Sequence, residues 1–115
     1  MTDEYVAKRR YPRIPSENAV LVKKLDAERI EGFAKTRVVG LGGCMFVSDE
    51  PLGGGTHLEI LISVRGHVAK AIGQVVYEVA RGPKEIEIGV EFVELPAPDR
   101  EVIQGLFPSP VAGNA

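Results

Sequence analysis

The chain has 115 residues, of which 44% are hydrophobic and 26% are charged, and its net charge is −2. This length fits one domain, and the composition is ordinary for a globular chain. The slightly acidic balance argues against general binding to DNA or RNA, which favours a basic domain, so any recognition of an anion must be local.

The cysteine, histidine and hydrophobic residues exclude several further classes. One cysteine, Cys44, leaves no disulfide within the chain, and two histidines beside it do not make a structural zinc site. We expect Cys44 to be a small buried hydrophobe. No apolar run approaches the roughly 20 residues of a membrane span, and residues 1–4 do not resemble a signal peptide, so we expect no membrane insertion and a cytoplasmic location.

Residues 1–15 are predicted to form an N-terminal arm with a concentrated positive charge. Four cations fall within six residues, and two prolines favour an extended path; the cations are Lys8, Arg9, Arg10 and Arg13. Planar guanidinium groups suit phosphate oxygens or the O6/N7 edge of guanine. The alternative is a solvated basic arm without a ligand, and composition alone leaves both interpretations open.

Alternating apolar residues predict a series of short strands after the arm. The predicted segments are 19–25, 30–39, 44–47, 58–64, 68–79 and 85–92. In the second segment, period two puts Val39 on the same face as Phe33, and in the fifth it puts Tyr77 with the small or apolar odd positions. In the last segment, isoleucine, valine and phenylalanine point inward and the glutamates form a solvated outer face.

A glycine-rich connection lies between the second and third predicted strands. Three glycines, Gly40, Gly42 and Gly43, fall within four residues, which indicates either positive φ or a close approach of two backbones. The spacing matches neither a dinucleotide fingerprint nor a P-loop.

One short amphipathic helix is predicted near the C-terminus. Pro96, Pro98 and two acids mark its first turn, Val102, Ile103, Leu106 and Phe107 recur at helical spacing, and Pro108 stops it. The predicted fold is therefore mainly β, a small antiparallel six-stranded barrel with a short C-terminal helix over residues 16–108. Residues 109–115 are predicted to be a flexible tail.

Taken together, residues 9–107 resemble a PilZ domain, the bacterial receptor module for cyclic di-GMP. Three features carry the resemblance: Arg-x-x-x-Arg at residues 9–13, the glycine-rich connection followed by residues 44–47, and the ending at residues 89–95 before the short helix. The resemblance implies that Arg9 and Arg13 hold phosphates and guanine edges. It implies that Arg10 stacks or makes a further phosphate contact.

The second motif of the family, Asp/Asn-x-Ser-x-x-Gly, is degenerate in this chain. Gly40 stands where the family has Asp or Asn, and Gly42 stands where it has Ser; with a turn one residue shorter, Cys44 replaces the closing glycine. Either alignment lacks the side chains that would accept from guanine and reach a phosphate. Backbone N–H groups of Gly40, Gly42 and Gly43 can still cradle a phosphate.

Two functional hypotheses follow from the resemblance and stay open on the sequence. The first is a non-enzymatic cyclic di-GMP effector with weakened nucleotide binding, which signals through protein contacts. The second is a PilZ-like adaptor that does not bind cyclic di-GMP and acts only through protein contacts in the control of motility or surface behaviour. No nucleophile–base pair, metal set or paired carboxylates can be assembled, so we expect no enzyme activity and no cofactor.

Overall fold

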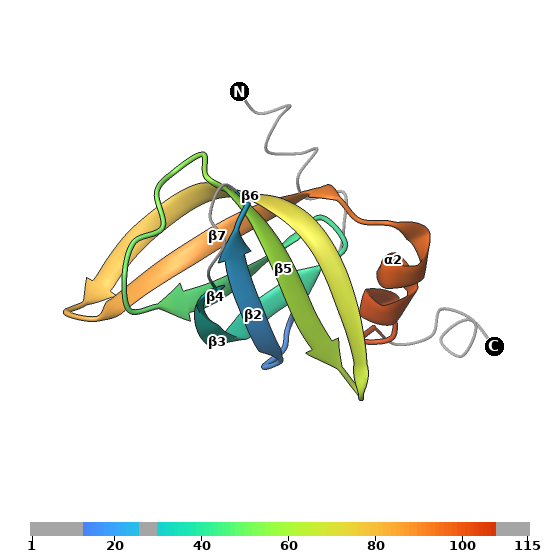
Figure 1. Cartoon of the computed structure of the whole chain (residues 1–115). Coiled ribbons are helices and arrows are strands. Elements are labelled where there is room, and N and C mark those ends of the chain that lie inside the picture. The colour runs from blue at the N-terminus through green and yellow to red at the C-terminus, as the bar shows by residue number, and fades with distance from the viewer. Residues whose placement is uncertain (1–12, 26–29, 108–115) are drawn as a thin grey trace, which may run out of the picture.

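The computed structural model describes residues 13–25 and 30–107 (Figure 1). Arg9, Arg10 and the predicted tail lie outside these described residues. The elements, in chain order, are β1 (Arg13–Pro15), β2 (Ala19–Lys24), β3 (Ile30–Gly40), β4 (Gly43–Ser48), β5 (His57–Val64), β6 (His67–Gly82), β7 (Glu85–Glu94) and α2 (Ala97–Gln104).

Six of the strands close into a barrel, as the alternating pattern predicts. Strand order is β3-β2-β5-β6-β7-β4 with every neighbour antiparallel, and β4 pairs back onto β3 to complete the ring. Short β1 is a seventh strand, which pairs only with the end of β3. The residues just before the barrel therefore lie against its β3–β4 corner.

The barrel interior is filled by the residues that period two predicted. On β5 the four inward apolar residues Leu58, Ile60, Ile62 and Val64 are all buried, and on β7 the inward residues Ile88 and Val90 are buried as well. Side chains alternate across a strand, so the residues between them face outward on the barrel surface. Two of the outward residues of β7, Gly89 and Glu91, line a pocket on the barrel surface.

A bulge on each of two strands, β3 and β6, turns one residue away from the face that the alternating pattern predicts. The β3–β4 register shifts between Thr36 and Val38, so Val39 is fully buried whereas Phe33 is 81% exposed. The β6–β7 register shifts between Val75 and Tyr77, so Val75 is buried whereas Tyr77 is 41% exposed. An extra residue in one strand re-aims every side chain beyond it, which strict alternation does not anticipate.

The helix α2 packs beside the barrel on β6, as Figure 1 shows. Ile103 is completely buried, and the other apolar residues of the predicted stripe pack against the core. The Asp99 carboxylate accepts a 2.8 Å hydrogen bond from the Lys70 backbone N–H and so ties the first turn to the sheet. The predicted helix is confirmed, although it ends at Gln104, before Pro108.

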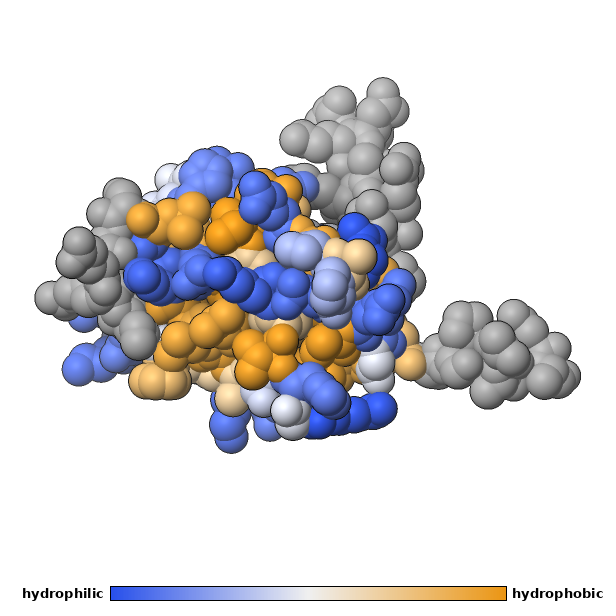
Figure 2. Space-filling view, turned by 45° about the vertical axis from the view of Figure 1, so that its right-hand side comes forward, coloured by the Kyte–Doolittle hydropathy of each residue, from blue (hydrophilic) through white to orange (hydrophobic). Residues whose placement is uncertain are grey.

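The surface mixes apolar and hydrophilic side chains. Figure 2 shows apolar patches on either side of a hydrophilic band on the face that it presents. Such mixing is ordinary for protein surfaces and does not by itself mark a binding site. Among the described residues, none of the helices is long and apolar enough to cross a membrane.

Candidate functional site

A pocket of about 330 Å³ lies where β1, the β3–β4 turn, β6, β7 and the start of α2 meet. It is the pocket that contains an arginine of the predicted motif. The lining residues that matter for its chemistry are Arg13, Val38, Gly43, Tyr77, Glu91 and Arg100.

The structure brings part of the arginine motif and the glycine-rich connection together. Arg13 is the register partner of Gly40 across the β1–β3 pair, and both Arg13 and Gly42 line the pocket. Two segments that are about 30 residues apart in sequence thus share one site. Arg9 and Arg10, the other predicted binding residues, lie outside the described residues.

Strand β1 is fixed in place by a buried threonine on β3. The Thr36 hydroxyl donates to the Ser16 carbonyl oxygen at 2.6 Å and accepts from the Asn18 N–H at 2.9 Å. The Ser16 N–H donates to the Arg37 carbonyl oxygen at 2.9 Å. These bonds hold the chain just after β1, so the backbone of the strand that carries Arg13 has a defined position.

Gly43 is required by a close approach of β4 to β7 beneath the pocket. A Cβ atom on Gly43 would lie 2.1 Å from the Val90 carbonyl oxygen, a separation that a real side chain cannot adopt. The Phe92 N–H donates to the Gly42 carbonyl oxygen at 2.8 Å, which ties the turn to β7. Of the two reasons predicted for the glycine run, the structure therefore supports close approach at Gly43.

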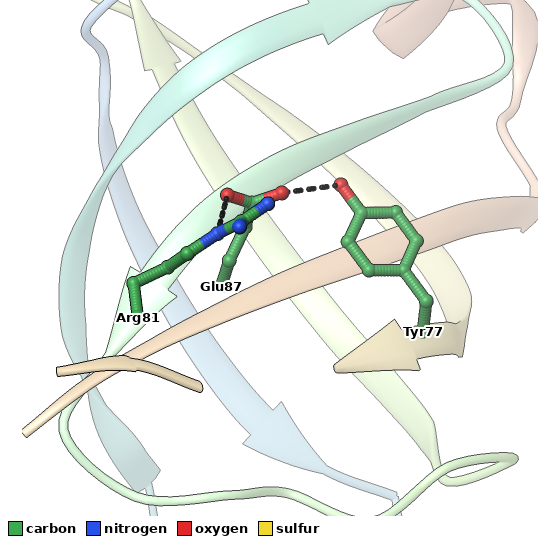
Figure 3. Close-up of polar contacts among 3 residues, drawn as sticks. All are labelled: Tyr77, Arg81 and Glu87. Atoms are coloured by element: carbon green, nitrogen blue, oxygen red, sulfur yellow. Dashed lines mark hydrogen bonds and ion pairs between the residues drawn. The ribbon is translucent and has the colours of Figure 1, made fainter. Parts of the chain in front are cut away.

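An aromatic ring forms one wall of the pocket. Tyr77 lies over Gly89, since a Cβ atom there would meet the Tyr77 ring at 2.0 Å. The Tyr77 hydroxyl donates to one Glu87 oxygen at 3.2 Å, and the Arg81 Nε donates to the other at 3.2 Å (Figure 3). Glu87 therefore binds Tyr77 through one carboxylate oxygen and Arg81 through the other.

The surroundings of Tyr77 favour the protonated form of its hydroxyl. Burial raises the pKa of Tyr77, and the charge and hydrogen bond of Glu87 raise it further. The positive charges of Arg13 and Arg81 partly oppose this increase in the Tyr77 pKa. Arg13 and Tyr77 both line the pocket, so the cation and the aromatic ring belong to one site.

Sequence reasoning missed three residues of this pocket. Glu91 was assigned to a solvated face, Tyr77 to the small or apolar side of its strand, and Arg100 to a helix start. Arg100 carried a usable signal, because a cation near a helix N-terminus meets the unfavourable end of the helix dipole. For Tyr77 and Glu91, only the bulge and the strand pairing reveal the site.

Cys44 borders the pocket but is chemically quiet, as predicted. Its side chain is only 6% exposed, and burial raises the pKa of its thiol to about 12. We expect the native protein to resist alkylation by iodoacetamide at pH 8 and to react rapidly once unfolded in guanidinium, because only the thiolate is nucleophilic. Mass spectrometry of both samples measures this difference, and equal labelling of the folded and unfolded protein would contradict it.

A second hollow, of about 370 Å³, lies over β2, β3 and β4 on another part of the surface. Its charged lining residues are Asp49 and Lys84, which compensate one another, and it contains no residue of either predicted motif. The pocket beside Arg13 is therefore the better candidate for an anionic ligand.

Comparison with known proteins assigns the fold. The family model for the PilZ domain matches residues 7–107. The chain is similar in structure to the inhibitor of motility MotI/DgrA of Bacillus subtilis, with a TM-score of 0.72 and 17% identity over 85% of this chain and 48% of that one. It is similar to Escherichia coli YcgR in complex with c-di-GMP, with a TM-score of 0.68 and 18% identity over 85% of this chain and 43% of that one.

A third similar structure is a single domain. It is the PilZ domain of CeSA from a cellulose-synthesizing bacterium, with a TM-score of 0.63 and 18% identity over 83% of this chain and 93% of that one. The chain thus spans less than half of the Bacillus subtilis and Escherichia coli proteins but nearly all of this domain. Comparison with curated protein sequences finds no match.

Proposed function

The chain belongs to the PilZ domain family, and on that basis we propose that it is a non-enzymatic cyclic di-GMP effector that signals through a protein partner. The observation that carries the proposal is the pairing of Arg13 with Gly40, which joins the arginine segment and the glycine turn at one pocket. The structure of Escherichia coli YcgR with c-di-GMP supports this choice of ligand.

The chemistry of the pocket suits this ligand. A guanidinium can act as a fork toward phosphate or guanine O6/N7, and Arg13 and Arg100 provide two of them. The Tyr77 ring offers a flat surface on which a base can stack. We propose that Arg9 and Arg10 add further contacts from the arm.

We propose a register for the second motif that differs from both predicted alignments. Gly43 is the closing glycine, so Val38 stands at the Asp/Asn position and Gly40 at the Ser position of Asp/Asn-x-Ser-x-x-Gly. Two observations support this register: Gly43 cannot carry a side chain, and Val38 lines the pocket. In this register both polar side chains are absent, as they are in the predicted alignments.

Loss of these two side chains weakens the proposed binding. Each missing polar contact is worth on the order of 1–2 kcal/mol, so their joint loss lowers affinity by roughly ten- to a thousandfold. The arginines and the backbone amides of the turn remain to hold the phosphates. The proposed function is therefore that of a low-affinity receptor for cyclic di-GMP.

Titration calorimetry with cyclic di-GMP tests the proposal. We expect the wild-type protein to give a saturable heat at ligand concentrations up to about 1 mM, and Arg13→Ala to abolish it. Arg65→Gln, which removes a cation from the turn between β5 and β6, is the matched control and should bind as wild type does. A folded wild-type protein that gives no heat would refute the proposed nucleotide binding.

The apolar side chain of Val38 in the pocket favours a second candidate function. In this alternative the chain is an adaptor that binds no cyclic di-GMP and acts only through a protein partner. Capture of a partner from bacterial lysate, compared between wild type and Arg13→Ala, separates the two functions. If the chain is an adaptor, Arg13→Ala should capture the same amount of partner as the wild type. If it is an effector, added cyclic di-GMP should change the amount of partner captured, and Arg13→Ala should remove this response.

A further inference from the structure

Glu87 and Glu91 lie on the same outward face of β7 but differ in their partners. Both oxygens of Glu87 are occupied, one by the Tyr77 hydroxyl and the other by Arg81. Glu91 is partly buried in the pocket, yet within the described part of the chain it makes no hydrogen bond or ion pair through its side chain. No described residue therefore occupies its carboxylate.

The neighbours of Glu91 on the sheet do not occupy this carboxylate. On one side its register partner is Gly43, which has no side chain. On the other side it is Gln74, whose amide donates to the Gly55 carbonyl oxygen at 3.2 Å. The close approach that requires glycine at position 43 therefore leaves this neighbour of Glu91 without a side chain.

The register places Glu91 and Arg13 on opposite sides of the glycine turn. Arg13 pairs with Gly40 at the end of β3, and Glu91 pairs with Gly43 at the start of β4. Both line the same pocket of about 330 Å³. One ligand bound over the turn therefore meets a cation at one end and a carboxylate at the other.

An ionised carboxylate accepts hydrogen bonds and donates none, and it repels phosphate. The part of an anionic ligand that faces Glu91 must consequently present donors, while its phosphates face Arg13. Guanine presents N1–H and N2–H₂ side by side, a pair of donors that a carboxylate accepts with both oxygens. Adenine presents an acceptor at N1 beside its N6–H₂ group, so only one hydrogen bond can form there.

We infer that Glu91 selects guanine in this pocket by accepting from its N1–H and N2–H₂ groups. This role rests on the proposed binding of cyclic di-GMP, and it adds an acceptor from β7 that is separate from the two motif positions on the β3–β4 turn. Glu91 is thus a specificity residue, whereas Arg13 serves affinity for the phosphates.

Calorimetry with cyclic di-GMP and cyclic di-AMP tests this role in the wild type, Glu91→Gln and Glu85→Gln. We expect Glu91→Gln to weaken cyclic di-GMP binding by about ten- to a hundredfold, because a charged hydrogen bond is lost and an amide nitrogen faces a donor. The preference for cyclic di-GMP over cyclic di-AMP should shrink by a similar factor. Glu85 lies on the same face of β7 outside the pocket lining, so Glu85→Gln should bind as the wild type does.

Different outcomes overturn different parts of this proposal. If the wild type binds cyclic di-GMP and Glu91→Gln binds it within twofold, the role of Glu91 is wrong and the proposed function stands. If the folded wild type binds neither dinucleotide, the proposed function is wrong and the role of Glu91 falls with it. Thermal melting of each variant establishes that it is folded before the titration.

Discussion

Replacing Val38 with Asp and Gly40 with Ser in one variant is expected to tighten cyclic di-GMP binding by roughly ten- to a thousandfold. The two changes supply a carboxylate and a hydroxyl at the positions that our register assigns to Asp/Asn and Ser. Val38 already lines the pocket, and Asp is close to Val in volume, so the new carboxylate enters a site that is already formed. Calorimetry of the variant against the wild type measures the gain.

The matched control for this gain is the pair of changes that the sequence alone would suggest. Gly40→Asp with Gly42→Ser follows the alignment predicted without the structure, and it adds the same two chemical groups in another register. We expect this control to give less than a tenth of the gain. If it tightens binding more than Val38→Asp with Gly40→Ser, then Gly43 is not the closing glycine of the motif.

Replacing Gly43 with Ala is expected to destabilise the fold by about 1–3 kcal/mol and to abolish ligand binding. The new methyl group would lie 2.1 Å from the Val90 carbonyl oxygen, and backbone atoms cannot move aside as a flexible side chain can. Strands β4 and β7 must separate where they form the floor of the pocket. Urea denaturation measures the loss in the free energy of unfolding, and calorimetry measures the loss of binding.

Gly54→Ala provides the comparison for this prediction. No heavy atom lies within 4 Å of a Cβ atom at Gly54, so its substitution should change stability by no more than about 0.5 kcal/mol. A Gly43→Ala protein that unfolds at the same urea concentration as Gly54→Ala would show that β4 and β7 tolerate a side chain there. In that case, steric need would no longer support the proposed register.

The division of roles between β1 and β7 suggests how affinity and specificity are separated in this pocket. The bonds of Thr36 hold the chain just after β1, and Arg13 on that strand supplies positive charge for the phosphates. Glu91 lies across the turn and, in our proposal, distinguishes guanine from adenine. Arg13→Ala should therefore weaken binding of both cyclic dinucleotides, whereas Glu91→Gln should weaken cyclic di-GMP more than cyclic di-AMP.

The fold class, the family and most of the barrel could be predicted from local patterns of residues. In Leu58 to Val64 and in Ile86 to Phe92 every second residue is apolar, so the inward faces could be predicted directly, and the core confirms them. The helix was equally clear, because its apolar residues recur at helical spacing and Ile103 is buried. These features depend on residues that are close together in the sequence, so the spacing of apolar residues predicts them.

The residues that line the pocket could not be predicted in this way, because they come together through strand pairing. The bulges in β3 and β6 arise from how two strands pair, and they turned Val39 inward and Tyr77 outward against the alternating pattern. The steric need for Gly43 comes from Val90 on another strand, and Glu91 enters the site because it pairs with that glycine. A pocket built from the end of β1, one turn, two strands and a helix depends on contacts between distant segments, and no single stretch of sequence contains them.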